Sequence, residues 1–214
     1  MPTQKTQVTR DTRRSSTTTR AINQRADAQR NRAKILAATV TAIRKNPDAS
    51  VADIAAEAGV GRMTLYGHFR NRAELIEAAL LDSLERAEDV LSEISLDGDA
   101  RDAFRRLVAS SWVFVDQSRA VLAAAQKELS PGRIRDLHEK AEARMHGLLR
   151  RGQAEGTFRS DLPVNLLLTT THVVLNGAAE EVRTGNLDPN DAPWFIEEIL
   201  LPAFTHETHS EQGQ

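Results

Sequence analysis

The sequence predicts an all-α fold of about nine helices. From Ala26 onward, apolar residues recur at the three- and four-residue spacing of amphipathic helices. No stretch alternates strictly between apolar and polar residues as a half-buried strand would, and Gly, Pro and capping residues separate the helical segments. With 214 residues, the chain can bury the core of one large domain or of two small ones.

Composition narrows the class of protein. The sequence holds no cysteine, which excludes disulfides and thiolate metal sites. It has no uncharged apolar run near the ~20 residues that span a bilayer, and its first residues lack the apolar stretch of a signal peptide. We therefore expect a cytoplasmic protein with no membrane partner.

Charge is distributed unevenly along the chain. Residues 1–72 hold 14 Lys and Arg against 5 Asp and Glu, a net charge of +9, whereas the whole chain has a net charge of −2. The remaining residues therefore carry −11. A basic first third joined to an acidic remainder indicates that only the first third meets a polyanion.

The basic segment begins with residues that have few apolar side chains. Residues 1–25 are rich in Thr, Ser, Gln and Arg, and they cannot offset the entropy lost on ordering. We expect a disordered basic arm there, which either contacts a polyanion or stays solvated. The first helix is predicted over residues 26–44, with Ile35, Ala38 and Ile43 buried.

A short helix, a glycine-containing turn and a second short helix come next. Ser50, with Asp53 three positions on, forms the capping-box pattern that starts a helix ending near Glu57. Gly59 supplies the positive φ of a tight turn, and a third helix follows over residues 62–69. This is the helix-turn-helix pattern, in which the second helix enters the major groove of DNA.

The rest of the chain is predicted to be a series of antiparallel helices. A capping pattern at Asn71 and Glu74 opens a long fourth helix that continues to Ile94. Residues 205–214 are expected to form a disordered tail. Five further helices are predicted, over residues 100–118, 119–129, 132–155, 163–184 and 193–203.

The third helix divides its side chains between two faces. Leu65 and Phe69 fall on the side that must pack against Ile54 and Ala55, and the opposite side is predicted to meet DNA. The alternative is a helix-turn-helix used only for packing. The predicted DNA-binding residues are Ser50, Gly61, Arg62, Met63, Thr64, Tyr66, Gly67, His68, Arg70 and Arg72.

These residue types suit two kinds of contact. Arg62 can bond guanine bidentately, and Met63 and Thr64 can touch base edges or a thymine methyl group. Contacts to phosphates position a protein on DNA without choosing the sequence. They are expected from Tyr66, His68, Arg70, Arg72 and the backbone N–H groups of Gly61 and Asn71.

The stretch SVADIAAEAGVGRMTLYGHFRNRAELIEAAL resembles the DNA-binding segment of the TetR family of one-component transcriptional regulators. Weaker resemblance extends through RAKILAA, RGQAEGTFRSDLP and ILLPAF. The resemblance implies a homodimer whose C-terminal helices enclose a small-molecule cavity. We therefore expect a DNA-binding domain over residues 26–72 and an effector-binding and dimerisation domain over residues 73–204.

Two positions depart from the family's pattern. Gly61 stands where the family usually has Ser or Thr, so a side-chain cap and a phosphate contact are lost. Gly67 lies at the centre of the outward face, where a larger side chain is common, although glycine costs about 1 kcal/mol relative to alanine inside a helix. Base readout is therefore expected to rest on Arg62, Met63 and Thr64.

The helix predicted over residues 163–184 is apolar nearly all round, so it must be buried on more than one side. Together with the last helix it is the predicted dimer face, and the alternative is an internal core helix. The expected interface residues are Leu168, Leu175, Ala178, Ala179, Ile196, Ile199 and Leu200.

A polar stripe on the same helix lines a ligand cavity, forms a solvated face, or forms a polar strip within the dimer interface. Larger and polar side chains of the preceding helices are further candidates for the cavity wall, although each could be ordinary core. The predicted ligand-binding residues are Ser111, Trp112, Gln126, Met145, His172 and Asn176.

No other chemistry is predicted. His138, Glu142 and His146 share one helix face, but three ligands along a straight helix cannot surround one ion tetrahedrally. The sequence shows no catalytic triad spacing, phosphate-cradling loop or paired-carboxylate motif. We therefore expect no metal site, no cofactor and no enzymatic activity.

The predicted function is that of a homodimeric repressor that binds a palindromic DNA operator and is released by a small molecule. Within the same fold, the alternative is a regulator that activates or that responds to no ligand. A different class remains open as well, a helical enzyme or protein-interaction scaffold with a vestigial DNA-binding head.

Overall fold

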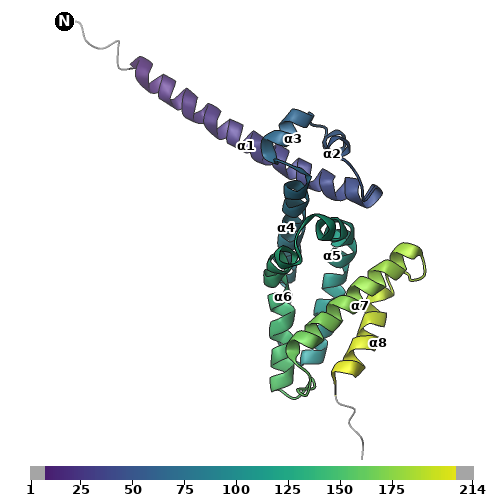
Figure 1. Ribbon diagram of the computed structural model, residues 1–214. Coiled ribbons are helices and arrows are strands. Elements are labelled where there is room, and N and C mark those ends of the chain that lie inside the picture. Colours follow the sequence, from purple (N-terminus) through teal and green to yellow (C-terminus); the bar gives the residue numbers. More distant parts are fainter. Residues whose placement is uncertain (1–7, 206–214) are drawn as a thin grey trace, which may run out of the picture. The chain divides into compact units, whose positions relative to one another are not determined.

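The computed structural model describes the backbone of residues 8–205 and the side chains of residues 26–139 and 142–205. Within this range every regular element is an α-helix, which confirms the all-α prediction. The helices are α1 (Val8–Lys45), α2 (Val51–Glu57), α3 (Arg62–His68), α4 (Arg72–Leu91), α5 (Ala100–Glu128), α6 (Pro131–Ala154), α7 (Val164–Thr184) and α8 (Ala192–Phe204), as Figure 1 shows.

The first helix is longer than predicted. α1 begins at Val8, whereas the sequence analysis placed residues 1–25 in a disordered arm. Residues 8–25 contain no Gly or Pro, so a helix held at its packed C-terminal half can propagate backwards with one hydrogen bond per added residue. Residues 1–7 lie outside the described residues, as does the predicted tail beyond Thr205.

One predicted helix boundary is absent from the described chain. The two helices expected over residues 100–118 and 119–129 form the single helix α5. No Gly or Pro occurs between Ala100 and Glu128, and nothing local stops the helix there. Helix α5 is capped by Asp99, whose carboxylate accepts the backbone N–H of Arg101 at 2.8 Å.

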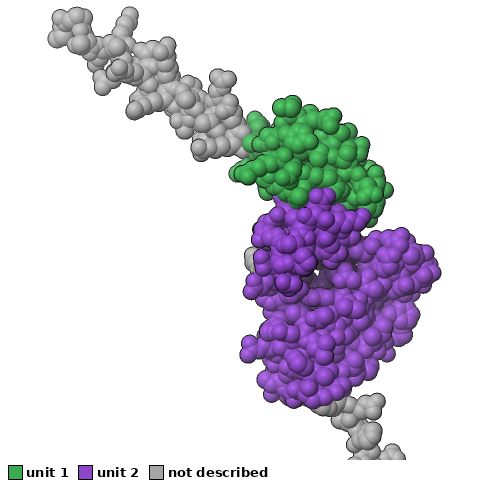
Figure 2. Space-filling model, viewed as in Figure 1, with its two compact units in different colours: residues 1–75 green, residues 76–214 purple. Residues whose placement is uncertain are grey.

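The chain forms two compact units, residues 1–75 and residues 76–214 (Figure 2). The predicted domain boundary, between residues 72 and 73, lies inside the first turn of α4. Helix α4 is shared, because its first four residues belong to unit 1 and the others to unit 2.

The core of unit 1 is built from the second half of α1 and the three helices that follow it. Ile35, Ala38 and Ile43 are buried, as their helical spacing predicted. Thr39 is also buried, and its hydroxyl donates to the Ile35 carbonyl at 2.7 Å, so its polar group is satisfied. The other buried side chains of this core are Leu36, Ala42, Ala49, Ile54, Ala55, Leu65, Phe69 and Leu75.

The core of unit 2 is centred on aromatic rings of α5, α8 and the segment that follows α6. Phe104 makes edge-to-face contacts with Phe158 and Phe204, with ring centroids 6.0 and 5.8 Å apart. The Arg159 backbone N–H donates to the Phe204 carbonyl at 2.8 Å. The segment after α6 is therefore tied to the end of α8.

None of the helices in the described part of the chain combines the length and the apolar character needed to cross a membrane.

Candidate nucleic-acid interface and ligand cavity

The start of α2 is fixed by a reciprocal cap. The Asp53 backbone N–H donates to Ser50 Oγ at 3.2 Å, and the Ser50 backbone N–H donates to Asp53 Oδ2 at 2.8 Å. The Ser50 hydroxyl also donates to Asp53 Oδ2 at 2.7 Å. These hydrogen bonds from Ser50 hold the pKa of the Asp53 carboxyl below its usual range. The predicted capping box is confirmed.

The turn between α2 and α3 is closed by backbone hydrogen bonds. The Val60 N–H donates to the Ala55 carbonyl at 3.0 Å, and Ala58 donates to Ile54 at 2.9 Å. Gly59 adopts a φ of 65°, the left-handed conformation that favours glycine. The turn therefore sets the direction in which α3 leaves α2.

Helix α3 has one buried and one exposed face. Leu65 and Phe69 are buried, and the Arg32 guanidinium lies 5.5 Å from the centre of the Phe69 ring. Met63 is 83% exposed, the largest value among the large hydrophobic side chains of the described residues, and Tyr66 is 44% exposed. The other exposed residues of this face are Arg62, Thr64, Gly67 and Arg70, with His68 at its edge.

Some of the predicted DNA-binding side chains already make hydrogen bonds within unit 1, and others do not. Ser50 is occupied in the cap of α2, and Arg72 donates from Nε to the Ala49 carbonyl and from a terminal nitrogen to the Pro47 carbonyl, both at 3.1 Å. Arg72 therefore holds the loop that leads into α2. In contrast, the side chain of Arg62 has no partner among the described residues, and that of Arg70 is 92% exposed.

The two glycines that depart from the family's pattern leave open space. A β-carbon at Gly67 would meet no atom within 4 Å, and one at Gly61 would only touch Thr64 Oγ1 at 3.7 Å. No side chain caps α3 at Gly61. Larger residues would fit both positions, so packing within unit 1 does not require glycine there.

A cavity of about 300 Å³ lies within unit 2, walled by α4, α5, α6 and α7. Its volume is at the small end of the range for ligand pockets. Five of the six predicted ligand-binding residues line it, namely Ser111, Gln126, Met145, His172 and Asn176. The apolar wall is made mainly by Leu84, Leu91, Leu107, Phe114, Val115, Leu122, Ile134 and Leu175.

Polar groups of two helices meet in this cavity. His172 Nδ1 lies 3.4 Å from Glu142 Oε1, and His138 lines the same wall. His138 Nδ1 lies 2.9 Å from the Ile134 carbonyl, a contact that favours the proton on that nitrogen. Burial lowers the pKa of His172 and the nearby His138 lowers it further, while Glu142 acts in the opposite direction.

Trp112 does not line the cavity, contrary to the sequence prediction. Its side chain is buried in the core of unit 2, and its indole N–H donates to the Pro189 carbonyl at 3.0 Å. Trp112 lies one position from Ser111, so a rotation of 100° about α5 turns it away from the cavity. It ties α5 to the loop between α7 and α8.

Most of the predicted dimer residues were also wrongly assigned. Ala178 is partly buried against the core of unit 2, and only Ile199, at 57%, is well exposed. The other five, Leu168, Leu175, Ala179, Ile196 and Leu200, are buried in the core of unit 2 itself. They pack within one chain because α5, α7 and α8 are close neighbours.

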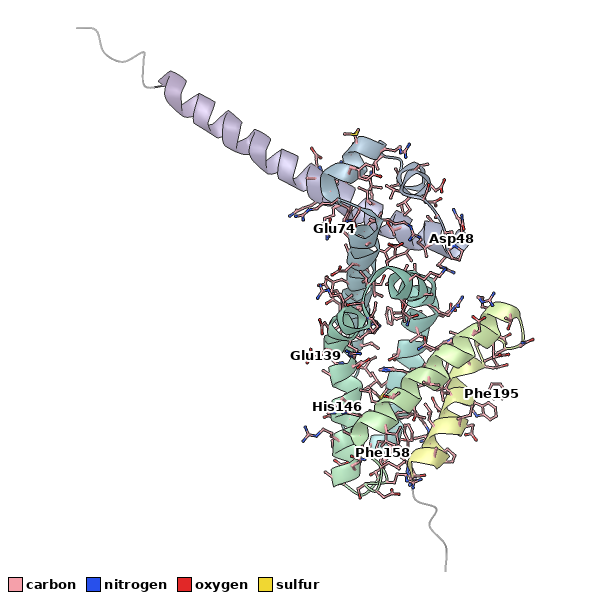
Figure 3. All side chains as sticks on the ribbon, in the orientation of Figure 1. Asp48, Glu74, Glu139, His146, Phe158 and Phe195 are labelled. Atoms are coloured by element: carbon pink, nitrogen blue, oxygen red, sulfur yellow. The ribbon has the colours of Figure 1, made fainter. Side chains whose placement is uncertain are left out.

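Apart from Ile199, the large exposed apolar residues of α7 and α8 were not among the predicted dimer residues. Leu166 and Val173 lie on α7, and Trp194 and Phe195 lie at the start of α8 with their rings 4.7 Å apart. Phe195 projects from α8 away from α5 and α7 (Figure 3). The sequence did contain one indication of this exposure. Trp194, Phe195 and Ile196 are adjacent on a helix, so their side chains point in directions 100° apart and cannot all face one core.

This arrangement, a packed helix-turn-helix with an exposed second helix followed by a helical unit with a cavity, defines a DNA-binding regulator. Residues 35–79 match the model of the bacterial regulatory proteins of the tetR family. The chain is 30% identical over 139 residues to the transcriptional repressor KstR2 of Rhodococcus jostii, covering 61% of this chain and 68% of that protein. It is 45% identical over 78 residues to the regulator TtgR of Pseudomonas putida, covering 36% and 37%.

Solved structures show the same fold. The fatty acid degradation regulator FadR of Bacillus halodurans matches with a TM-score of 0.68 and 21% identity, over 79% of this chain and 94% of that chain. FadR of Bacillus subtilis, solved in complex with stearoyl-CoA, matches with a TM-score of 0.65 and 19% identity, over 80% and 98%. The chain belongs to the TetR family of transcriptional regulators. Because its relatives are named as regulators, the prediction that it is a regulator and not an enzyme is confirmed.

Proposed function

We propose that the chain acts as a homodimeric repressor that binds a palindromic operator and is released by a small molecule. The observation that carries this proposal is the exposed face of α3, which presents Met63, Tyr66 and Arg62, whose guanidinium has no partner among the described residues. Burying that face against DNA explains why these side chains are not packed against the protein. The repressor function named for the relative KstR2 supports the direction of control.

The residues of α3 suit both readout and positioning. Arg62 in the first turn can bond a guanine edge, and Met63 and Thr64 beside it can contact thymine methyl groups. Tyr66, His68 and Arg70 reach the phosphates on either side. Gly67 has open space around it, which allows the backbone of α3 to approach the groove closely.

The proposed dimer forms through the exposed apolar faces of α7 and α8. Val173 and Gly177 are exposed on successive turns of α7, and a β-carbon at Gly177 would meet no atom within 4 Å. Trp194, Phe195 and Ile199 continue the apolar surface on α8. Exposed aromatic side chains of this size are typical of a protein interface.

The proposed release mechanism uses α4. This helix is continuous from the cap beside α3 into the wall of the cavity. Two recognition helices must lie about 34–36 Å apart to occupy successive major grooves. A ligand that prefers a different spacing of the two heads lowers operator affinity, and a 100-fold loss requires about 2.7 kcal/mol of coupling. A structural neighbour solved with stearoyl-CoA supports a small molecule as the effector.

The test is binding of the full chain to the DNA upstream of its own gene, measured by gel shift and fluorescence anisotropy over a range of salt concentrations. A repressor of this kind gives a specific complex of two chains on one palindromic site, weakened by salt. A scaffold with a vestigial head forms no complex with this DNA that survives competition by random DNA.

A further inference from the structure

Two ion pairs join α4 to α6 within unit 2. The Arg133 guanidinium bonds Glu77 at 2.5 Å, and Arg144 donates to Glu88 Oε1 at 2.9 Å. The closely packed pairs among the described helices of unit 2 are α5–α6, α5–α7, α5–α8, α6–α7 and α7–α8, and they do not include α4. The cavity lies along the inner side of α4, so these two pairs are direct links between α4 and α6.

In the Glu88–Arg144 pair, Arg144 lines both the cavity and a second hollow, and Glu88 lines the second hollow. The second hollow is formed by α4, α6 and the loop after α4. Gly147, one turn beyond Arg144, leaves that surface open, because a β-carbon there would meet no atom within 4 Å. Arg151 also lines this hollow, on the same face of α6 as Arg144 and about 10 Å along the helix.

Buried hydrogen-bond donors are left over at this junction. Arg144 Nε and both Nε and a terminal nitrogen of Arg151 are buried without a hydrogen-bond partner among the described residues. Arg151 Nε forms an ion pair with Glu155 Oε1 at 3.7 Å, but this distance is too long for a hydrogen bond. The one unpaired acceptor is Glu88 Oε2. Three unpaired donor groups against one acceptor favour a ligand group rich in acceptor oxygens, and a carboxylate or phosphate is such a group.

We propose that the effector is an amphipathic anion, with an apolar body in the cavity and a carboxylate or phosphate head at Arg144 and Arg151. The wall around Leu84, Phe114 and Leu122 accepts the apolar body. The inference rests on the proposed function, since it names the chemistry of the ligand that releases DNA. A compact carboxylate reaches Arg144, and a larger phosphate-bearing head extends to Arg151.

The same geometry links binding to control. The anionic head competes with Glu88 for Arg144, because both are acceptors for one guanidinium. Loss of the Glu88 bond removes one of these two ion pairs between α4 and α6. Helix α4 then moves more freely, and it is the helix that enters unit 1.

Isothermal titration calorimetry of the full chain without DNA tests the inference. The probes are decanoate, decanoyl-CoA, neutral decanamide and cationic decylamine. We expect one or both anions to bind at least about tenfold more tightly than the amide and the amine, because a charge-assisted hydrogen bond contributes about that factor or more.

Variants assign the head group. Arg144→Gln lowers affinity for the anions about 10- to 100-fold and leaves amide binding unchanged. Arg151→Gln weakens decanoyl-CoA more than decanoate. Arg150→Gln is the matched control, because Arg150 is exposed on the same helix and lines neither space. Glu88→Gln acts in the opposite direction and raises anion affinity, since it removes the competing charge.

The outcomes are distinct. Equal binding of decanamide and decanoate, full anion affinity in Arg144→Gln, or no binding by any probe overturns the inference. Failure of the proposed function appears separately, as the absence of a specific DNA complex with the unliganded chain. If Arg144→Gln fails to fold, Glu88→Gln still tests the inference, because an anion affinity that does not rise in this variant contradicts it.

Discussion

Phe158 packs directly on the backbone of Gly152. A β-carbon at position 152 would lie 2.1 Å from Phe158 Cδ2, closer than any two non-bonded carbons can approach. The Phe158 backbone N–H also donates to the Gly152 carbonyl at 3.0 Å, so the ring cannot move away without breaking this bond. The end of α6 is therefore joined to the aromatic core through a glycine.

Gly152→Ala is expected to destabilise unit 2 by at least about 1–3 kcal/mol, because the buried ring must shift out of its packed position. Urea unfolding followed by tryptophan fluorescence measures this, since Trp112 and Trp194 both lie in unit 2. Gly147→Ala on the same helix is the control, and it should be neutral or stabilising by up to about 1 kcal/mol. Equal effects of the two variants would contradict the packing argument.

Trp112→Ala is expected to cost about 3–5 kcal/mol of stability, because it empties a buried site and leaves the Pro189 carbonyl without its donor. Trp112→Phe keeps most of the ring and loses only the hydrogen bond, at a cost of about 1 kcal/mol or slightly more. Thermal unfolding monitored by circular dichroism distinguishes the two. If Trp112→Ala instead keeps native stability and alters ligand binding, the prediction that Trp112 lines the cavity is correct after all.

Ile199→Asp is expected to convert the dimer to monomers, because it places an unpaired charge in the centre of the proposed apolar interface. Analytical ultracentrifugation at micromolar concentration reports the change. Val90→Asp, also about half exposed but on α4, should leave the oligomeric state unchanged. A dimer that survives Ile199→Asp would place the interface on another surface.

Arg62 and Arg72 should give different mutational profiles. Arg62→Ala is expected to leave stability within about 0.5 kcal/mol and to lose about 1–3 kcal/mol of DNA affinity at one base pair of each half-site. Arg72→Ala removes two bonds to the loop before α2, so it should lower stability and weaken all operator variants equally. Anisotropy with single-base operator variants measures both profiles. A uniform loss for Arg62→Ala would make it a phosphate contact.

The pKa of His172 predicts a pH dependence of stability. Burial and His138 lower this pKa below its ordinary 6.5, although Glu142 opposes the change. Between the lowered pKa and 6.5, the unfolded chain binds more protons than the folded chain, so stability rises with pH. Stability is therefore lost as the pH falls below about 6.5. Urea titrations from pH 5 to pH 7.5 measure how the free energy of unfolding changes with pH. His172→Gln should reduce this change, and an unchanged pH dependence would assign it to other groups.

The helices of this protein and its helix-turn-helix follow from local features of the sequence. The Ser50–Asp53 cap, the positive φ of Gly59 and the burial of Leu65 and Phe69 were all predicted and all occur. Each depends on residues within a few positions of one another, because caps and turns are closed by neighbouring backbone groups. The exposed face of α3 follows from the same helical periodicity, because it consists of the residues that point away from the core.

Tertiary structure alone decided which faces of the later helices point inward. Leu168 and Ile196 belong to the core, whereas Val173 and Trp194 are exposed, although all four are apolar. An apolar pattern reports that a face is buried and does not report what buries it. The alternative of a core helix, left open for residues 163–184, describes most of the residues that the sequence analysis assigned to the dimer.

Partners distant in the sequence also emerged only from the folded chain. Glu88 and Arg144 are 56 residues apart, and neither stands out among the 58 charged residues counted as Lys, Arg, Asp and Glu. Their pairing depends on how α4 and α6 are placed around the cavity, which no local propensity encodes. The sequence by itself determined most of the helices, the cap of α2 and the exposed face of α3, because these arise from short-range hydrogen bonds and helical periodicity. Five of the six residues predicted for the cavity line it, but the rest of its wall and its ion pairs required the tertiary structure, because they arise from the packing of helices remote in the chain.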